Sequence, residues 1–287
     1  MRFPVLFPRT LPTGLGVLFL ALLLPSGCGS PDGAAADTSA DPPPATAISP
    51  EAPTPTPLTA DDWIILFDGT SLDGWRGYNA TTMPPGWAIE DGVLTFADGP
   101  KTTDAEYEGG KDILYARDSF ANFELYLEWK LPPGGNSGIF YHVREGYGAP
   151  PEVAPEYQLI DDEHYTDYHD ITAYNESLGY TENPNEIKPL QSTAADYAMY
   201  PPATDKQLRP AGEWNSSRIV FTPERVEYWL NEELATSFVP WSADWQAKRQ
   251  SGKWGLAPDY GKFRSGYIAL QDHDSPLWFR NIRIRRL

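Results

Sequence analysis

Short segments in which apolar and polar residues alternate recur through most of this chain. Between Phe123 and Lys130, large apolar side chains occupy every second position. This two-residue period predicts β-strands with one buried face. The segments 87–90 and 93–96 are joined by Asp91-Gly92, a pair that favours the tight turn of a β-hairpin. Further strands are expected at 137–143, 156–160, 218–222, 225–230, 266–271 and 277–284. Many short strands with intervening turn residues predict an all-β sandwich or barrel.

Helical signals are sparse by comparison. Ser242 can cap a helix over residues 243–250, and Gly252 can end it, so one short helix is expected. Residues 162–200 are polar, rich in tyrosine and interrupted by proline. Long irregular segments of this kind are usually functional or disordered.

The N-terminus has the pattern of a secretory signal. Arg2 and Arg9 are followed by an apolar run from Leu15 to Leu24 and then by small residues up to Cys28. The run is too short to cross a bilayer, which needs about 20 residues. A lone cysteine at the expected cleavage position resembles a bacterial lipoprotein. We therefore predict a signal peptide over residues 1–27 and lipidation of Cys28, with simple secretion as the alternative.

A proline-rich segment follows the cysteine. Residues 29–58 contain eight prolines and no aromatic residue, so residues 28–58 are predicted to form a disordered tether. The folded domain is then expected over 59–287.

The lipidation signal departs from the usual pattern at one position. The residue three before the cysteine is Pro25, where lipoproteins usually have leucine. The expected location is the outer membrane, by a lipid anchor, or otherwise the periplasm or the exterior.

Composition removes several classes of function. The formal charge is −18, which argues against a nucleic-acid partner because the phosphate backbone needs clustered Lys and Arg. A single cysteine excludes a disulfide within the chain and a zinc site built on paired cysteines. The only membrane contact expected is the lipid anchor.

Several phrases occur in a fixed order, and together they are far more specific than any one alone. They are LFDGTSLDGW at 66–75, FEL at 123–125, GNSGIFYHV at 135–143, PEYQLID at 155–161, GEWN at 212–215, YWLN at 228–231, GYIALQDH at 266–273 and WFRNI at 278–282. This ordered set resembles the 3-keto-disaccharide hydrolase domain family over about residues 63–287. The resemblance implies a concanavalin A-like jelly-roll β-sandwich. Two features depart from the family: Asn231-Glu232 replaces the usual Asn-Gly turn, and residues 165–193 form a longer link.

The resemblance implies a glycoside whose sugar already carries a ketone at carbon 3. That carbonyl acidifies the proton on carbon 2, so a base can remove it and the enolate can expel the aglycone from carbon 1. Water then adds back, which gives net hydrolysis. The route needs a base, a group that stabilises the enolate and an acid for the leaving oxygen.

Strand alternation supplies candidates for these roles. His142, Glu156 and His273 should point outward from three strands, and the resemblance implies that those strands are neighbours. They are predicted as catalytic bases or as ligands of a divalent metal ion, and the sequence does not separate the two roles. The predicted contacts to substrate are Asn136, Gln158, Asp161, Tyr197, Gln271 and Asp272. Asp161 and Asp272 also fit a simpler role as turn residues.

Two other functions fit the same fold. One is a non-catalytic carbohydrate-binding module on a lipid-anchored stalk, because fold does not settle function. The other is a retaining glycosidase of the laminarinase type, which needs two carboxylates about 5–5.5 Å apart on one strand face. Glu156 and Asp161 have opposite parity, so this second alternative is disfavoured. The expected partner is an oxidised glycoside or another saccharide.

Overall fold

The computed structural model describes residues 62–97 and 112–287. The predicted signal peptide, tether and Cys28 lie outside these residues and stay predictions. Among the described residues, no helix combines the length and apolar character that crossing a membrane requires.

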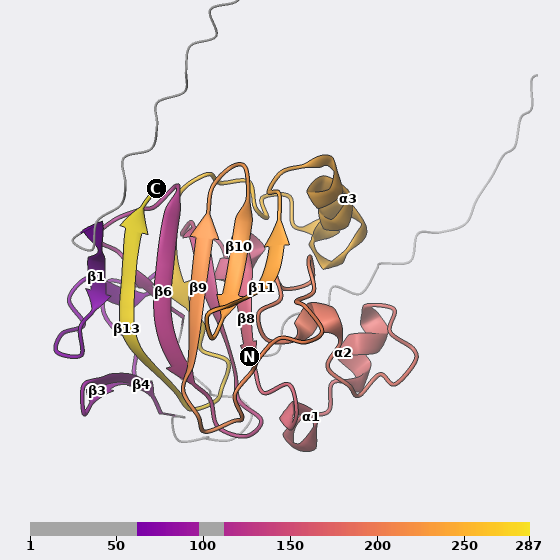
Figure 1. Cartoon of the computed structure of the whole chain (residues 1–287), viewed down its shortest axis with the longest axis horizontal. Helices are drawn as coiled ribbons and strands as arrows, with labels where there is room; N and C mark the ends of the chain where they lie inside the picture. The colour runs from indigo at the N-terminus through magenta and orange to yellow at the C-terminus, as the bar shows by residue number, and fades with distance from the viewer. Residues whose placement is uncertain (1–61, 98–111) are drawn as a thin grey trace, which may run out of the picture. The chain divides into compact units, whose positions relative to one another are not determined.

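The chain folds into two antiparallel sheets (Figure 1). The larger sheet has the strand order β11-β10-β9-β6-β13-β4-β3, and β1 pairs with β13 beside this path. Its strands are β1 (Ile64–Phe67), β3 (Trp87–Glu90), β4 (Val93–Phe96), β6 (Phe123–Lys130), β9 (Asn215–Phe221), β10 (Val226–Leu230), β11 (Glu233–Phe238) and β13 (Leu277–Arg286). Neighbouring strands are mostly distant in sequence, which is the connectivity of a jelly roll. The predicted all-β sandwich is confirmed.

The smaller sheet has the strand order β2-β5-β12-β7-β8. Its strands are β2 (Trp75–Gly77), β5 (Ile113–Tyr115), β7 (Asn136–Val143), β8 (Glu156–Ile160) and β12 (Tyr267–Leu270). One face of this sheet packs on the larger sheet, through side chains such as Ile139, Tyr157 and Leu159. We call the opposite side of the smaller sheet its outer face.

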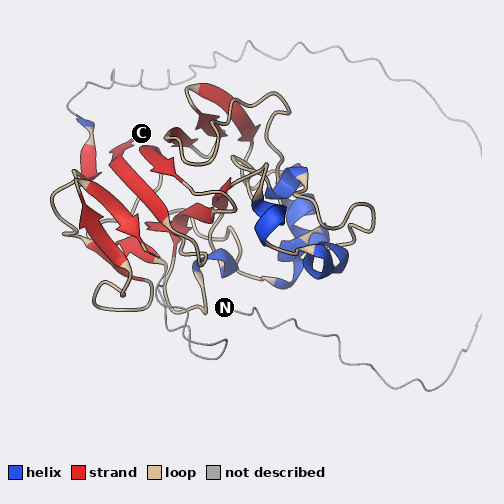
Figure 2. Ribbon diagram, turned by 90° about the horizontal axis from the view of Figure 1, so that it is seen from below, coloured by secondary structure: helices blue, strands red, loops and turns tan. Residues whose placement is uncertain are grey.

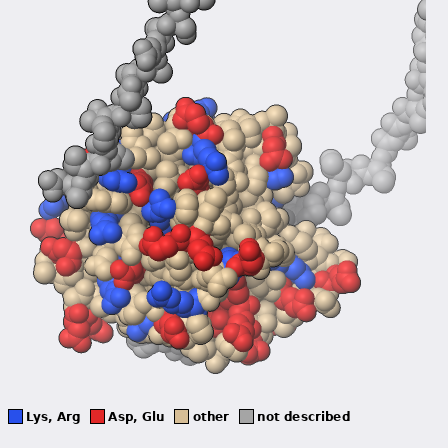
Figure 3. All heavy atoms as spheres, viewed as in Figure 1, with Lys and Arg blue, Asp and Glu red and all other residues tan. Residues whose placement is uncertain are grey.

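The core lies between the sheets and follows the predicted alternation. In β6, Phe123, Leu125, Leu127 and Trp129 are buried in the shared core. On the other side of β6, Glu128 binds Arg280 of β13, with Oε2 and Nε 2.6 Å apart. Figure 3 shows Lys and Arg side chains interspersed with Asp and Glu over the face in view. On the polar face of the larger sheet, acidic and basic side chains therefore lie next to one another.

The hairpin predicted at residues 87–96 is present as β3 and β4. Asp91 and Gly92 have φ angles of 49° and 79°. Positive φ at both central residues matches the type I′ turn that joins two-residue hairpins.

The helical content exceeds the one helix that the sequence predicts. That helix, α3, spans Ala243–Ser251, and the Ser242 hydroxyl accepts a hydrogen bond from Trp245 N at 3.2 Å. Two further short helices, α1 (Tyr165–Tyr168) and α2 (Thr172–Ser177), form within the segment expected to be irregular. Single 3₁₀ turns occur at Pro150–Glu152 (η2), Pro189–Gln191 (η3) and Lys253–Leu256 (η4). Figure 2 shows most of the helical segments gathered on one side of the sandwich.

The 162–200 segment also adds backbone to the smaller sheet. Beyond β8, Gln158 N donates to Ala195 O at 3.1 Å, and Ala194 N donates to Gln158 O at 2.9 Å. Tyr197 N donates to Glu156 O at 3.0 Å. Residues 194–197 therefore continue the sheet past its last named strand.

Candidate active site

The outer face of the smaller sheet carries most of the predicted site residues. Glu156 and Gln158 point to this face from β8, opposite Phe140 and Gly138 of β7. Tyr197 pairs with Glu156 through the backbone, and paired residues of antiparallel strands share a face. The structure thus brings Glu156, Gln158 and Tyr197 together on adjacent strands.

Gly138 makes room for the Glu156 carboxyl group. A Cβ atom added at Gly138 would lie 2.1 Å from Glu156 Oε1, far closer than any real contact. The carboxyl group therefore lies across β7, where only glycine leaves space. With its amide nitrogen turned toward the carboxyl group, Gln158 donates to Glu156 Oε1 at 3.0 Å and to Ser137 O at 3.1 Å.

Burial gives Glu156 an unusual proton affinity. The side chain is only 4% exposed, and this burial raises its pKa to about 8. The Lys253 ammonium opposes the rise, while Asp112 and Asp196 add to it. Asp112 is half-buried, and burial raises its pKa to about 7 although Asp272 N donates to its Oδ1 at 2.9 Å. Two carboxyl groups that titrate near neutral pH are suited to acid–base chemistry.

Two tyrosines and a lysine border Glu156. The hydroxyl oxygens of Tyr174 and Tyr197 are 2.5 Å apart, and Lys253 Nζ donates to Tyr174 Oη at 3.0 Å. The same ammonium lies 4.4 Å from the centre of the Tyr197 ring and 4.8 Å from that of Trp254. We call Asp112, Glu156, Gln158, Tyr174, Tyr197 and Lys253 the Glu156 cluster.

Three members of this cluster are not predicted from the sequence. Lys253 follows α3 in a 3₁₀ turn, and Tyr174 lies in α2, which was not predicted. Asp112 precedes β5, a strand of three residues that was also not predicted. None of the three belongs to a periodic segment, so alternation carried no signal for them.

His142 does not belong to this outer face, and its predicted position is wrong. The pairing of β12 with β7 shifts between Tyr267–Val143 and Ala269–Phe140, which marks a β-bulge. His142 has a φ angle of 57°, and its side chain is 2% exposed. Because the bulge breaks the alternation, the imidazole turns into the interior.

The surroundings of His142 are aromatic. Its ring centre lies 4.4 Å from that of Phe221 and 5.4 Å from that of Tyr141, and Nε2 is 2.9 Å from Ala121 O. Burial lowers its pKa to about 4. We assign His142 a structural role, because a neutral imidazole inside the core cannot meet a substrate.

His273 lies in the turn after β12 and is half-buried. Burial lowers its pKa, and the charge of His169 lowers it further. At the same end of the sheet, Asn136 N donates to Ser275 Oγ at 3.1 Å, and Asn136 Nδ2 donates to Tyr165 Oη at 3.4 Å. His273 and Asn136 therefore lie toward the α1 end of the site.

The remaining predicted substrate contacts are Asp161, Asp272 and Gln271, and the two aspartates accept hydrogen bonds from the backbone. Asp161 Oδ2 accepts a hydrogen bond from Gly134 N at 2.9 Å, and Asp272 Oδ1 accepts one from Asp274 N at 3.0 Å. These bonds fit the simpler role of turn residues. Gln271 differs, because its Oε1 is buried and has no hydrogen-bond partner among the described residues.

A metal site was predicted from His142, Glu156 and His273. Among residues 62–97 and 112–287, no group of three or more His, Cys, Asp or Glu side chains is arranged to hold a metal ion. The interior position of His142 removes one of the three proposed ligands. The described residues therefore do not fit the predicted ion, and we derive no step from it.

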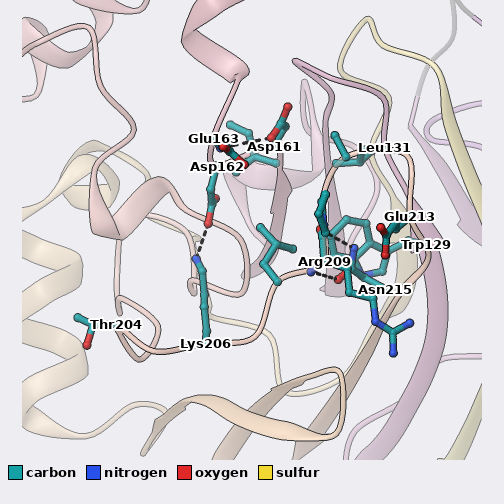
Figure 4. Close-up of a pocket in the computed structure, with 14 residues that line it drawn as sticks. Trp129, Leu131, Asp161, Asp162, Glu163, Thr204, Lys206, Arg209, Glu213 and Asn215 are labelled. Atoms are coloured by element: carbon teal, nitrogen blue, oxygen red, sulfur yellow. Dashed lines mark hydrogen bonds and ion pairs between the residues drawn. The ribbon is translucent and has the colours of Figure 1, made fainter.

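A cavity of about 290 Å³ lies beside the end of β8 (Figure 4). Lys206 Nζ and Asp162 Oδ2 are 2.7 Å apart there. Burial lowers the Lys206 pKa and raises that of Asp162, while the pairing opposes both shifts. The ammonium also donates to Ser192 Oγ and Thr193 O, so its hydrogen bonds are satisfied within the protein. The lining does not include Glu156 or Tyr197.

A family profile and a relative found by sequence agree on one family. The profile of the 3-keto-alpha-glucoside-1,2-lyase-like domain matches residues 62–285. A 3-keto-disaccharide hydrolase of Bacteroides thetaiotaomicron is 34% identical over 251 residues, covering 80% of each chain.

Solved structures point the same way. A candidate glycosyl hydrolase of Parabacteroides distasonis is 38% identical, with a TM-score of 0.68, over 80% of this chain and 98% of that one. A second candidate glycosyl hydrolase of the same organism is 27% identical, with a TM-score of 0.54, over 78% of this chain and 99% of the other. With the matching profile and the confirmed sandwich, these similarities show that the chain belongs to the family of 3-keto-alpha-glucoside-1,2-lyase-like domains.

Proposed function

We propose that this protein hydrolyses 3-keto-glycosides and that Glu156 is the base that removes the proton from carbon 2. The family membership supports a carbohydrate hydrolase. The observation that carries the finer proposal is the Glu156 carboxyl group, buried across Gly138 with its pKa raised to about 8. A base with a pKa near the working pH combines a usable ionised fraction with strong proton affinity.

The chemistry proceeds in two stages. Glu156 takes the carbon 2 proton, and the C–H electron pair forms the enolate of carbons 2 and 3. The enolate then restores the ketone as a double bond forms between carbons 1 and 2, and the C1–O bond breaks with its electron pair on the leaving oxygen. Water adds its hydroxyl group to carbon 1, and Glu156 returns its proton to carbon 2.

Neighbouring residues supply the polar contacts that this route needs. With its amide nitrogen turned toward the carboxyl group, Gln158 donates to Glu156 and holds the carboxyl group in place. Gln271, whose buried Oε1 has no hydrogen-bond partner among the described residues, is proposed as an acceptor for a sugar hydroxyl group. His273 and Asn136, toward the α1 end, are proposed as further substrate contacts. We also propose that the protein acts in the cell envelope, after secretion and lipidation at Cys28, on the strength of its N-terminal sequence.

The test uses the full chain and a panel of 3-keto-glucosides. The parent protein should release the aglycone and, in D₂O, should exchange the carbon 2 proton of a 3-keto sugar. Glu156→Gln should lose both activities, whereas Glu128→Gln, on the opposite sheet, should keep both. Saccharide binding without turnover, with and without added divalent metal, would refute the proposal and favour a non-catalytic carbohydrate-binding module.

A further inference from the structure

The proposed route needs an acid for the leaving oxygen, and the Glu156 cluster contains a chain of hydrogen bonds that ends in a cation. Lys253 Nζ lies 3.0 Å from Tyr174 Oη, which lies 2.5 Å from Tyr197 Oη. The chain joins three separate elements, namely η4, α2 and the segment paired with β8. The side chains of Lys253 and Tyr197 are half-buried, and Tyr174 is 37% exposed.

The chemistry of the groups gives the chain a direction. An ammonium group has donors and no acceptor, so Lys253 donates to the Tyr174 oxygen. Tyr174 then offers its single hydrogen to Tyr197, and the Tyr197 hydrogen is left for a substrate atom. This order leaves a transferable proton on Tyr197, which shares the outer face with Glu156.

The scaffold fixes Tyr197 beside Glu156. Tyr197 N donates to Glu156 O at 3.0 Å. The preceding residue, Asp196, forms a β-bridge with Tyr157 on the interior face. Because successive residues alternate between faces, Tyr197 shares the outer face with Glu156. Trp254 Nε1 donates to Tyr197 O at 3.1 Å and holds the other side of the segment. Burial raises the pKa of Tyr197 well above its usual value, and the neighbouring Tyr174 and Glu156 add to the rise.

The charge of Lys253 acts on Glu156, but no described carboxylate lies close enough to the Lys253 ammonium to form an ion pair. The ion pairs of the described residues do not include Lys253. Its surroundings are instead the rings of Tyr197, Trp254 and Tyr174, at 4.4, 4.8 and 5.4 Å from Nζ to the ring centres. Aromatic faces stabilise the cation without neutralising it, so its charge remains available to a developing phenolate.

We propose that Tyr197 is the catalytic acid for the leaving oxygen and that Tyr174 and Lys253 resupply its proton. As the C1–O bond breaks, the oxygen keeps the electron pair and takes the Tyr197 proton. The Tyr197 phenolate takes a proton from Tyr174, which takes one from the Lys253 ammonium. The water that adds to carbon 1 gives its second proton back to this chain, so every group returns to its starting state.

This inference rests on the proposed hydrolysis of 3-keto-glycosides. Substrates with different leaving groups test the acid role of Tyr197 separately from the hydrolysis itself. A nitrophenolate departs without protonation, whereas a sugar or methyl alkoxide needs an acid. We expect Tyr197→Phe to lower kcat on a methyl 3-keto-glucoside by about 10²- to 10⁴-fold, the usual contribution of an acid catalyst. On the 4-nitrophenyl 3-keto-glucoside the loss should be under about tenfold. Exchange of the carbon 2 proton in D₂O should survive.

Two further variants and a control complete the design. Tyr174→Phe and Lys253→Met should show the same dependence on leaving group, with smaller losses because only resupply is impaired. Tyr168→Phe, an exposed tyrosine of α1, should match the parent on both substrates. Equal loss on both substrates, or no loss on either, in Tyr197→Phe would overturn the acid assignment. A parent protein with neither exchange nor release would refute the proposed function itself.

Discussion

Replacing Glu156 by Gln should stabilise the fold by an amount that grows with pH. Burial raises the Glu156 pKa from 4.5 to about 8, so the folded state resists ionisation that the unfolded chain undergoes freely. Between these values the native state binds more protons, and stability falls as pH rises. At 1.36 kcal/mol for each pKa unit, the cost is about 3 kcal/mol at pH 7 and levels off near about 5 kcal/mol above pH 8. Because glutamine does not ionise, the Glu156→Gln variant does not have this loss of stability.

Urea denaturation of the parent and the Glu156→Gln variant over a pH series measures this difference directly. The two proteins should have similar free energies of unfolding near pH 4.5 and diverge above it, because all other titrating groups are shared. Glu128→Gln is a matched control. Although burial alone raises the Glu128 pKa, hydrogen bonds from Asn281 and Arg280 lower it overall. That variant should therefore lose stability at neutral pH. A difference between Glu156→Gln and the parent that stays constant with pH would refute the reasoning.

Three more substitutions test other parts of the structure. His142→Asn should keep turnover while costing about 1–3 kcal/mol, since asparagine tolerates positive φ but loses the aromatic packing; measured turnover and urea midpoint decide this. Gly138→Ala should lower kcat about 100-fold by displacing the Glu156 carboxyl group, and the accompanying stability loss should shrink in a Glu156→Ala background. Asp162→Asn and Lys206→Met should each cost about 3 kcal/mol in urea unfolding, and the double variant less than their sum.

Much of the sandwich was predictable because its strands obey a local rule. The hairpin around Asp91-Gly92 and the helix capped by Ser242 form where the sequence places them. Each depends on residues within a few positions of one another. The short helices α1 and α2 were not predicted, since neither has a side-chain cap at its N-terminus or a regular apolar stripe.

The site was predictable only where the alternation is unbroken. Glu156 and Gln158 lie on the face that parity predicts, because β8 pairs in regular register with β7. His142 fails because a bulge inserts one extra residue, and a single residue reverses the face of everything that follows. Lys253 and Tyr174 reach the site through tertiary contacts between elements that share no sequence period.

The backbone of residues 194–197 has a consequence for solubility as well as for chemistry. If β8 were an exposed edge strand, its unpaired backbone N–H and C=O groups could pair with a strand of another molecule. Such edge-to-edge pairing leads to aggregation. Residues 194–197, which include Tyr197, pair with β8 and so cover this edge of the sheet. A shortening of the 162–200 segment that removes residues 194–197 would therefore expose this edge of the sheet to self-association and would also remove Tyr197 from the site.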